Sequence, residues 1–291
     1  MKQKTKNLIE LHFAVFLFGF AALFGKVIHQ NPFVIVLGRT VFASITLFLM
    51  IFFSNRSFKL DGKKDYLFLF SVGVIYALHW FTFFKSVQVS NVAIAVLTFS
   101  TFPLFVTFLE PYFFNEKIKV FDIVTALIAL FGVSLIIPRF DLADNFMQGA
   151  IWGILAGFTY AIVAVACRKS IKKYPSSVIA FYQNLSAAIF SLPIVIWFRP
   201  QVSLNEFLLL ILLGVLFTAF TGILFIGSLE NLKVQHVSII TNLEPVYAII
   251  FAAVLLQEIP TLRTIIGGVI ILGTVVLAIL KSKHKPIPLE H

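Results

Sequence analysis

The sequence predicts an all-α membrane protein with ten transmembrane helices, arranged as two inverted five-helix repeats. Three observations carry this prediction: the composition, the number of long apolar segments, and an internal repeat. Apolar residues make up 59% of the 291 positions, charged residues only 12%, and there are 35 Phe. A soluble domain has about 45–50% apolar and about 25% charged residues. A water-soluble chain of this composition would expose large apolar patches, so we expect the surface to face hydrocarbon.

Ten apolar segments are separated by clusters of charge, Pro and Asn. Each is close to the roughly 20 residues that a helix needs to cross a bilayer. The segments are continuous runs rather than alternating stretches of about ten residues, which argues against a transmembrane β-barrel. Their expected bounds are 8–28, 33–53, 66–86, 92–114, 120–137, 148–168, 177–197, 207–228, 236–256 and 262–280.

The distribution of Lys and Arg predicts the orientation. With the N-terminus inside, seventeen of these residues fall in inner segments and five at outer ends, while Arg39 lies within a helix. Cytoplasmic loops carry such an excess. We therefore expect an integral protein of the cytoplasmic membrane with both termini cytoplasmic. The tail 286–291 ends in Leu-Glu-His, which resembles the remnant of a purification tag.

The internal repeat pairs Pro103 with Pro245 and Glu116 with Glu258 at the same offset of 142 residues. It divides the chain into a first five-helix repeat, 1–144, and a second, 145–285. Because five is odd, the second repeat enters the membrane from the opposite side. Inverted repeats of this kind place a cavity near the midplane and are typical of secondary transporters. We expect helices 1, 3, 4, 6, 8 and 9 to line that cavity.

Several short motifs carry a resemblance to a known family. They are the stretch Asn242-Leu-Glu244-Pro245, the pair Gln257-Glu258, the pair Phe102-Pro103 at the matching place in the first half, and a Gly-rich last helix. With the five-plus-five layout, they resemble the EamA-type transporters of the drug/metabolite transporter superfamily over essentially the whole chain. The resemblance implies a carrier of small metabolites that works by alternating access, and it does not select one substrate.

Two charged residues deep in the expected helices are the first candidates for substrate binding. Ionisable groups within a bilayer are costly and are functional candidates by default. Arg39 lies about six residues into the second segment, where its guanidinium would offer a fork to a carboxylate or phosphate. Glu244 lies near the middle of the ninth segment and is a candidate for substrate binding or for carrying a coupled proton. The alternative for both is structural: Arg39 would pair with Glu244 or Glu110.

Polar and aromatic residues on other segments complete the predicted substrate site. Tyr76, His79, Trp80 and Phe83 share one helix face by their spacing. His79 and Trp80 are expected at the cavity, although an aromatic stripe is more often packing. Tyr160 and Asn242 are further candidates. Tyr182, Gln183 and Asn184 near the start of the seventh segment add polar groups that could also face the cavity. Pro103 and Pro245 remove backbone hydrogen bonds and are expected to break their helices. Gly149, Gly153 and Gly157 form a small-residue motif that favours close helix packing.

The missing motifs limit the function. No phosphate-binding loop, zinc-binding motif or defensible catalytic pair occurs, so we expect no enzyme, no cofactor and no metal. The single Cys allows no internal disulfide, and the basic residues lie in short loops rather than in a groove for nucleic acid. The expected partners are a small-molecule substrate, the lipid bilayer and a coupled proton. The sequence thus predicts a secondary active transporter of a small metabolite, such as an amino acid or a related organic anion. An uncoupled facilitator or channel is the alternative.

Overall fold

The computed structural model describes residues 2–114, 118, 120–171, 173–229 and 240–281. This part of the chain is helical and contains no strand. Its elements are α1 (Lys2–Ala21), α2 (Phe24–Val27), α3 (Pro32–Phe53), α4 (Lys63–Val89), α5 (Val92–Phe99), α6 (Phe102–Phe114), α7 (Val120–Ile136), α8 (Asn145–Ser170), α9 (Ser176–Phe198), α10 (Leu204–Gly214), the π-helix η1 (Val215–Phe220), α11 (Thr221–Leu229), α13 (Glu244–Leu255) and α14 (Leu262–Lys281).

Eight helical stretches in the described residues are long and apolar enough to cross a membrane. Three of them join neighbouring elements: α1 with α2, α5 with α6, and α10 through η1 to α11. Two shorter apolar helices, α7 and α13, occupy the places of the fifth and ninth expected segments. The all-helical membrane class is therefore confirmed. The expected start of the ninth segment, 236–239, and the tail 286–291 lie outside the described residues.

Two helices are interrupted at matching positions. A turn at Ser100 and Thr101 separates α5 from α6, and Pro103 is the second residue of α6. A turn at 242–243 precedes α13, whose second residue is Pro245. Proline suits the first turn of a helix because its missing N–H has no partner there. Both turns obey the 142-residue offset of the internal repeat.

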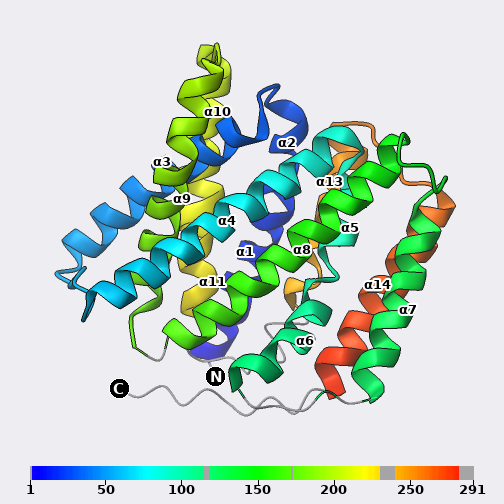
Figure 1. The fold of residues 1–291 in the computed structure, drawn as a ribbon, viewed down its shortest axis with the longest axis horizontal. Coiled ribbons are helices and arrows are strands. Elements are labelled where there is room, and N and C mark those ends of the chain that lie inside the picture. Colours follow the sequence, from blue (N-terminus) through cyan, green and yellow to red (C-terminus); the bar gives the residue numbers. More distant parts are fainter. Residues whose placement is uncertain (1, 115–117, 119, 172, 230–239, 282–291) are drawn as a thin grey trace.

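The long helices α4 and α8 cross the middle of the molecule side by side (Figure 1). Helices α3 and α9 pack beside them on one flank, and α7 and α14 form a pair at the other edge (Figure 1). The glycines of the α8 motif bring α8 close to α5. A Cβ added to Gly153 would collide with the Thr98 side chain, and one added to Gly157 would lie 3.1 Å from the Phe99 carbonyl oxygen. The motif therefore packs α8 against α5.

Contacts between connections define one end of the bundle, called here the Lys26 end. Lys26 Nζ donates to the Ser90 carbonyl over 2.8 Å and lies 3.6 Å from Glu258 Oε1. The second oxygen of Glu258 accepts from the Val92 N–H at 2.9 Å. Gln30 Nε2 donates to both carboxylate oxygens of Glu206, at 3.1 and 3.0 Å. The connections after α2, α4, α9 and α13 thus meet at this end.

The opposite end, called here the Ser54 end, joins the α3–α4 and α8–α9 connections. Lys173 Nζ lies 2.7 Å from Asp65 and 3.0 Å from Asp61, and the Tyr174 hydroxyl donates to Asp65 over 2.8 Å. Hydrogen bonds to Asp65 and then to Asp61 raise the pKa of Lys173, so the cluster remains charged in neutral solution. Alternate connections therefore gather at opposite ends, as a chain that crosses a bilayer repeatedly requires.

Candidate functional site

A cavity of about 510 Å³ lies within the helical bundle and reaches the Ser54 end. Side chains of α1, α3, α4, α5, α6, α8, α9, η1, α11 and α13 line it, including the exposed Ser54 and Arg56 near its mouth. The expected lining by helices 1, 3, 4, 6, 8 and 9 was incomplete. The second and seventh expected segments, α3 and α9, also line it: α3 contributes Arg39, and α9 contributes much of the polar wall.

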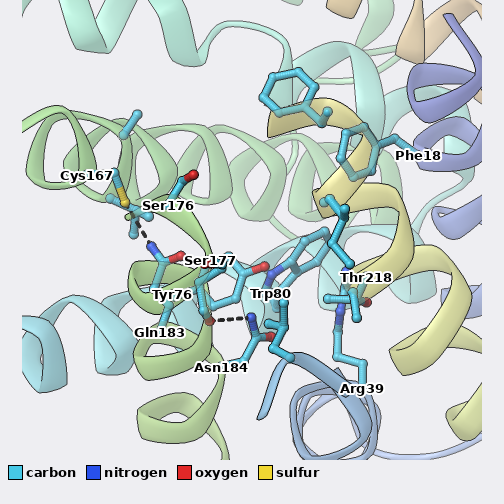
Figure 2. A pocket seen from close by; sticks show the side chains of 18 of the residues that line it. Phe18, Arg39, Tyr76, Trp80, Cys167, Ser176, Ser177, Gln183, Asn184 and Thr218 are labelled. Atoms are coloured by element: carbon cyan, nitrogen blue, oxygen red, sulfur yellow. Dashed lines mark hydrogen bonds between the residues drawn. The ribbon is translucent and has the colours of Figure 1, made fainter. Parts of the chain in front are cut away.

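Arg39 of α3 is the most unusual of these side chains. Only 1% of its surface is exposed, and its Nε and Nη1 atoms have no hydrogen-bond partner among the described residues. Its Cζ atom lies 3.4 Å from the centroid of the Trp80 ring, and Phe84 lies farther away at 5.7 Å. Such stacking is attractive but leaves guanidinium N–H groups unpaired. The site therefore presents free donors and a positive charge (Figure 2).

Close backbone packing holds Arg39 in place. Gly38 lies against the Leu210 side chain, and a Cβ on Gly214 would come 2.8 Å from the Arg39 carbonyl oxygen. The neighbouring π-helix η1 is supported by the Thr218 hydroxyl, which donates to the Leu213 carbonyl over 2.8 Å. Turns of this type often occur at functional sites. The packing of α3 against α10 thus fixes the backbone of Arg39 beside the cavity.

Glu244 is the first residue of α13 and also lines the cavity. Among the described residues, no salt bridge joins it to Arg39, and the side chain of Glu110 lies outside them. The structural alternative, an ion pair between Arg39 and Glu244, is therefore not formed. Arg39 and Glu244 line the same cavity as groups of opposite type without an ion pair between them.

His79 connects α4 to α8. Its Nδ1 lies 3.0 Å from the Ala156 carbonyl oxygen, which can only accept, so Nδ1 carries the proton. The imidazole ring lies 4.7 Å from Trp80 and 4.9 Å from Tyr160 between centroids. The predicted face of α4 therefore carries a histidine whose tautomer is fixed by the Ala156 carbonyl oxygen.

Aromatic rings form the apolar wall of the cavity. Tyr160 lies 5.5 Å from Phe99 and 5.0 Å from Phe102, measured between ring centroids. These spacings are those of favourable edge-to-face pairs. The indole Nε1 of Trp80 is buried without a partner in the described part of the chain, which adds one more free donor. An apolar or aromatic group fits this wall better than a fully hydrated one.

Five predicted substrate-binding residues come together at this cavity: Arg39, His79, Trp80, Tyr160 and Glu244. Asn242 does not join them. Its Nδ2 donates to the Leu272 carbonyl of α14 over 3.1 Å, which ties the turn before α13 to the last helix. Pro103 and Pro245 lie in first helical turns beside the lining residues Phe102 and Glu244 rather than on the cavity wall. The described residues contain no cluster of three or more metal-ligating side chains.

Among the polar residues of α9 at the cavity, the sequence indicated Gln183 and Asn184 but not Ser177. Ser177, Gln183 and Asn184 line the cavity, together with Cys167 of α8 (Figure 2). Ser177 and Asn184 are seven residues apart, which places them on one face of the helix. This spacing of polar residues in an otherwise apolar segment could have indicated Ser177. The same spacing also occurs where helices pack against each other.

The chain is similar to known transporters over most of its length. The model of the EamA-like transporter family matches twice, over residues 8–137 and 147–280. The transporter YxxF of Bacillus subtilis (strain 168) is 26% identical and aligns over 98% of this chain and 93% of its own length. The S-adenosylmethionine uptake transporter of Rickettsia conorii (strain ATCC VR-613 / Malish 7) is also 26% identical, over 70% of this chain and 68% of its own.

A solved crystal structure has the same fold. It superposes with a TM-score of 0.68 at 18% sequence identity and covers 95% of this chain and 97% of the other. The family model accounts for nearly all of the chain, and the relatives are transporters by name. The family and the relatives indicate an integral membrane transporter rather than an enzyme. The chain therefore belongs to the EamA-like transporter family.

Proposed function

We propose that the protein is a secondary active transporter of a small organic anion, in which Arg39 binds the anionic group and the aromatic wall holds an apolar or aromatic part. One observation carries this proposal: a buried arginine on the cavity wall with two unpartnered nitrogens. An unpaired charge in a low-dielectric site is costly. A carboxylate would supply the missing partner with charge-assisted hydrogen bonds.

The proposed architecture is two inverted repeats, residues 1–144 and 145–285, that alternate around this cavity across ten transmembrane helices. The double family match, the matching turns before Pro103 and Pro245, and the alternation of connections between the two ends support it. The excess of Lys and Arg in alternate segments supports cytoplasmic termini. Reporter domains inserted after Ser57 should then behave as cytoplasmic, and those after Asp144 as external. The same side for both would end this arrangement.

The binding proposal is tested with two compounds that differ in charge. We expect 3-phenylpropanoate to stabilise the purified protein against thermal unfolding, because a ligand that binds the folded state shifts the equilibrium towards it. Its uncharged amide, 3-phenylpropanamide, should stabilise the protein much less. Arg39→Lys should weaken binding of the carboxylate about tenfold or more, because a point charge replaces the fork.

Arg56→Lys is the matched control for that substitution. Arg56 lines the same cavity but is exposed at its mouth, where water screens its charge. Binding should change by less than about twofold in this variant. Equal binding of the acid and the amide, or full binding by Arg39→Lys, would contradict an anion site at Arg39.

Glu244 is the proposed carrier of a coupled proton, which also separates a coupled transporter from the facilitator. In proteoliposomes, a coupled protein accumulates its substrate in response to a pH gradient, whereas a facilitator only equilibrates it. Glu244→Gln should retain binding and exchange but lose the response to the gradient, because the amide cannot release a proton. Wild-type protein that never accumulates substrate against a gradient would favour the facilitator.

S-Adenosylmethionine is a second substrate worth measuring, because the Rickettsia relative is named for its uptake. This molecule combines a carboxylate with a planar base and a sulfonium cation. The free donors of Arg39 match the carboxylate, and aromatic faces such as Tyr160 and Phe102 attract cations and planar rings. Stabilisation of the wild type by this compound, lost in Arg39→Lys, would place it in the same site.

A further inference from the structure

We propose that Ser177, Gln183 and Asn184 of α9 form a second subsite, which accepts hydrogen bonds from a donor group of the substrate. This donor is a hydroxyl or an amine beside the carboxylate. The proposal rests on the proposed function, because it assumes that the carboxylate binds at Arg39. It makes Asn184 a residue that determines specificity.

Asn184 carries the argument. Only 4% of its surface is exposed, and it lies on the cavity wall. Its Nδ2 donates to the Ala180 carbonyl over 2.9 Å, and since a carbonyl oxygen cannot donate, the amide orientation is fixed. Its Oδ1 is buried without a hydrogen-bond partner in the described part of the chain. A buried polar atom left unsatisfied is costly, and a hydrogen-bond donor on a ligand would offset that cost.

Two neighbours on α9 give the subsite the same character. Gln183 Nε2 donates to the Cys167 sulfur over 3.1 Å, which leaves its Oε1 as the remaining polar atom on the side chain. Ser177 is 8% exposed, and its Oγ has no hydrogen-bond partner among the described residues. The amide groups therefore present acceptors, and none of the three side chains carries a charge. A hydrogen-bond donor on the ligand is the complement.

The two subsites have opposite hydrogen-bonding character. In Figure 2, Trp80 stands between Arg39 and the group formed by Gln183, Asn184 and Ser177. The first subsite offers only donors, since guanidinium and indole nitrogens cannot accept. The second offers acceptors. A ligand that satisfies both has a carboxylate and, a short distance away, a group that donates.

Three compounds that differ at one carbon test this inference. They are 3-phenylpropanoate, 3-phenyllactate and phenylalanine, which carry hydrogen, hydroxyl and ammonium at carbon 2. Their affinities for purified protein are measured by calorimetry. We expect the hydroxyl or the ammonium compound to bind about tenfold more tightly than 3-phenylpropanoate, the effect of one well-made hydrogen bond in a buried site.

Asn184→Leu should remove this preference while leaving the affinity for 3-phenylpropanoate within about twofold, which also shows that the variant is folded. Asn184→Asp retains an acceptor and adds a charge. It should favour phenylalanine over 3-phenyllactate if the natural donor is an amine, and should weaken both if the donor is a hydroxyl in a neutral site.

Ser191→Ala is the matched control. Ser191 lies seven residues beyond Asn184 and has a buried, unpartnered hydroxyl in the described structure, yet it does not line the cavity. It should leave all three affinities unchanged. Equal binding of the three compounds by the wild type, or a preference that survives in Asn184→Leu, overturns this inference alone. Failure of all three to bind overturns the proposed function and the subsite with it.

Discussion

Arg39 and Trp80 show how the site is stabilised in the absence of a ligand. A guanidinium on an aromatic face gains about 2 kcal/mol when both are desolvated. This is less than the several kcal/mol that burial of an unpaired ion costs. The free donors that binding requires therefore lower the stability of the folded protein. Such a conflict between stability and binding is common at functional sites. A structural arginine would instead have been paired.

This conflict predicts the effect of Arg39→Met on stability. Methionine fills similar space without a charge, so the free energy of unfolding should equal the wild-type value or exceed it by about 1–2 kcal/mol. Binding of 3-phenylpropanoate should be lost in the same variant. Thermal unfolding in detergent, with and without the compound, measures both. A strongly destabilised Arg39→Met would indicate that the arginine has a structural partner.

At this scale the sequence predicted much of the site. Depth within an apolar segment was sufficient to select Arg39 and Glu244, because charge in hydrocarbon is rare. It failed for Asn242, which does not line the cavity, and it indicated Asn184 as a cavity candidate without predicting its free acceptor. Their side-chain directions depend on which carbonyl each amide reaches, Leu272 for one and Ala180 for the other. Such tertiary contacts are not encoded in local spacing.

The helices themselves are held together by glycine contacts as much as by large apolar side chains. Gly132 of α7 and Gly267 of α14 lie against each other, so that a Cβ on Gly267 would come 2.6 Å from the Gly132 carbonyl oxygen. Without a hydrophobic driving force between helices in lipid, close packing of small residues is a main source of association. The α7–α14 pair depends on this contact.

Two alanine substitutions in α14 separate packing from helix propensity. Gly267→Ala should lower the free energy of unfolding by about 1–3 kcal/mol, because backbone must move to admit the methyl group. Gly273→Ala has nothing within 4 Å of the new Cβ and should be neutral or up to about 1 kcal/mol stabilising. Both are read from thermal unfolding. Equal effects of the two substitutions would refute a packing role for Gly267.

Helix positions were more predictable than helix interruptions. The expected segments agree with the observed helices to within a few residues at most ends, because apolar length is set by the bilayer. The π-helix η1 was not predicted. It depends on hydroxyls of Thr218 and Thr221, each donating to a carbonyl five residues earlier, and threonine in an apolar run carries no unique signal.

For the whole molecule, the decisive feature is that the two ends differ. The cavity reaches exposed residues at the Ser54 end, whereas Lys26, Glu258 and Val92 are bonded to one another at the Lys26 end. Under alternating access, opening of one end accompanies closure of the other. In the proposed alternating-access cycle, the contacts of Glu258 would stabilise the arrangement in which the Ser54 end is open.

Glu258→Gln tests this coupling with the single cysteine as the reporter. Cys167 lines the cavity, so a small hydrophilic maleimide should label it in the wild-type protein. Weakening the partly buried pair with Lys26 should shift the population towards the other state and slow labelling about two- to tenfold. Glu10→Gln, which removes a pair with Lys6 within α1, is the control and should not slow it. Unchanged labelling in Glu258→Gln would contradict a role in closure.

The interruption before α13 has a consequence for biosynthesis. With 12 residues, α13 rises only about 18 Å, well short of the roughly 30 Å of hydrocarbon. A span that contains Glu244 is a poor independent signal for insertion, because a carboxylate near the bilayer centre opposes it. Its entry therefore depends on earlier helices that supply the cavity wall and on α14 that follows. The ninth span is expected to be placed late, after the helices it packs against have been made.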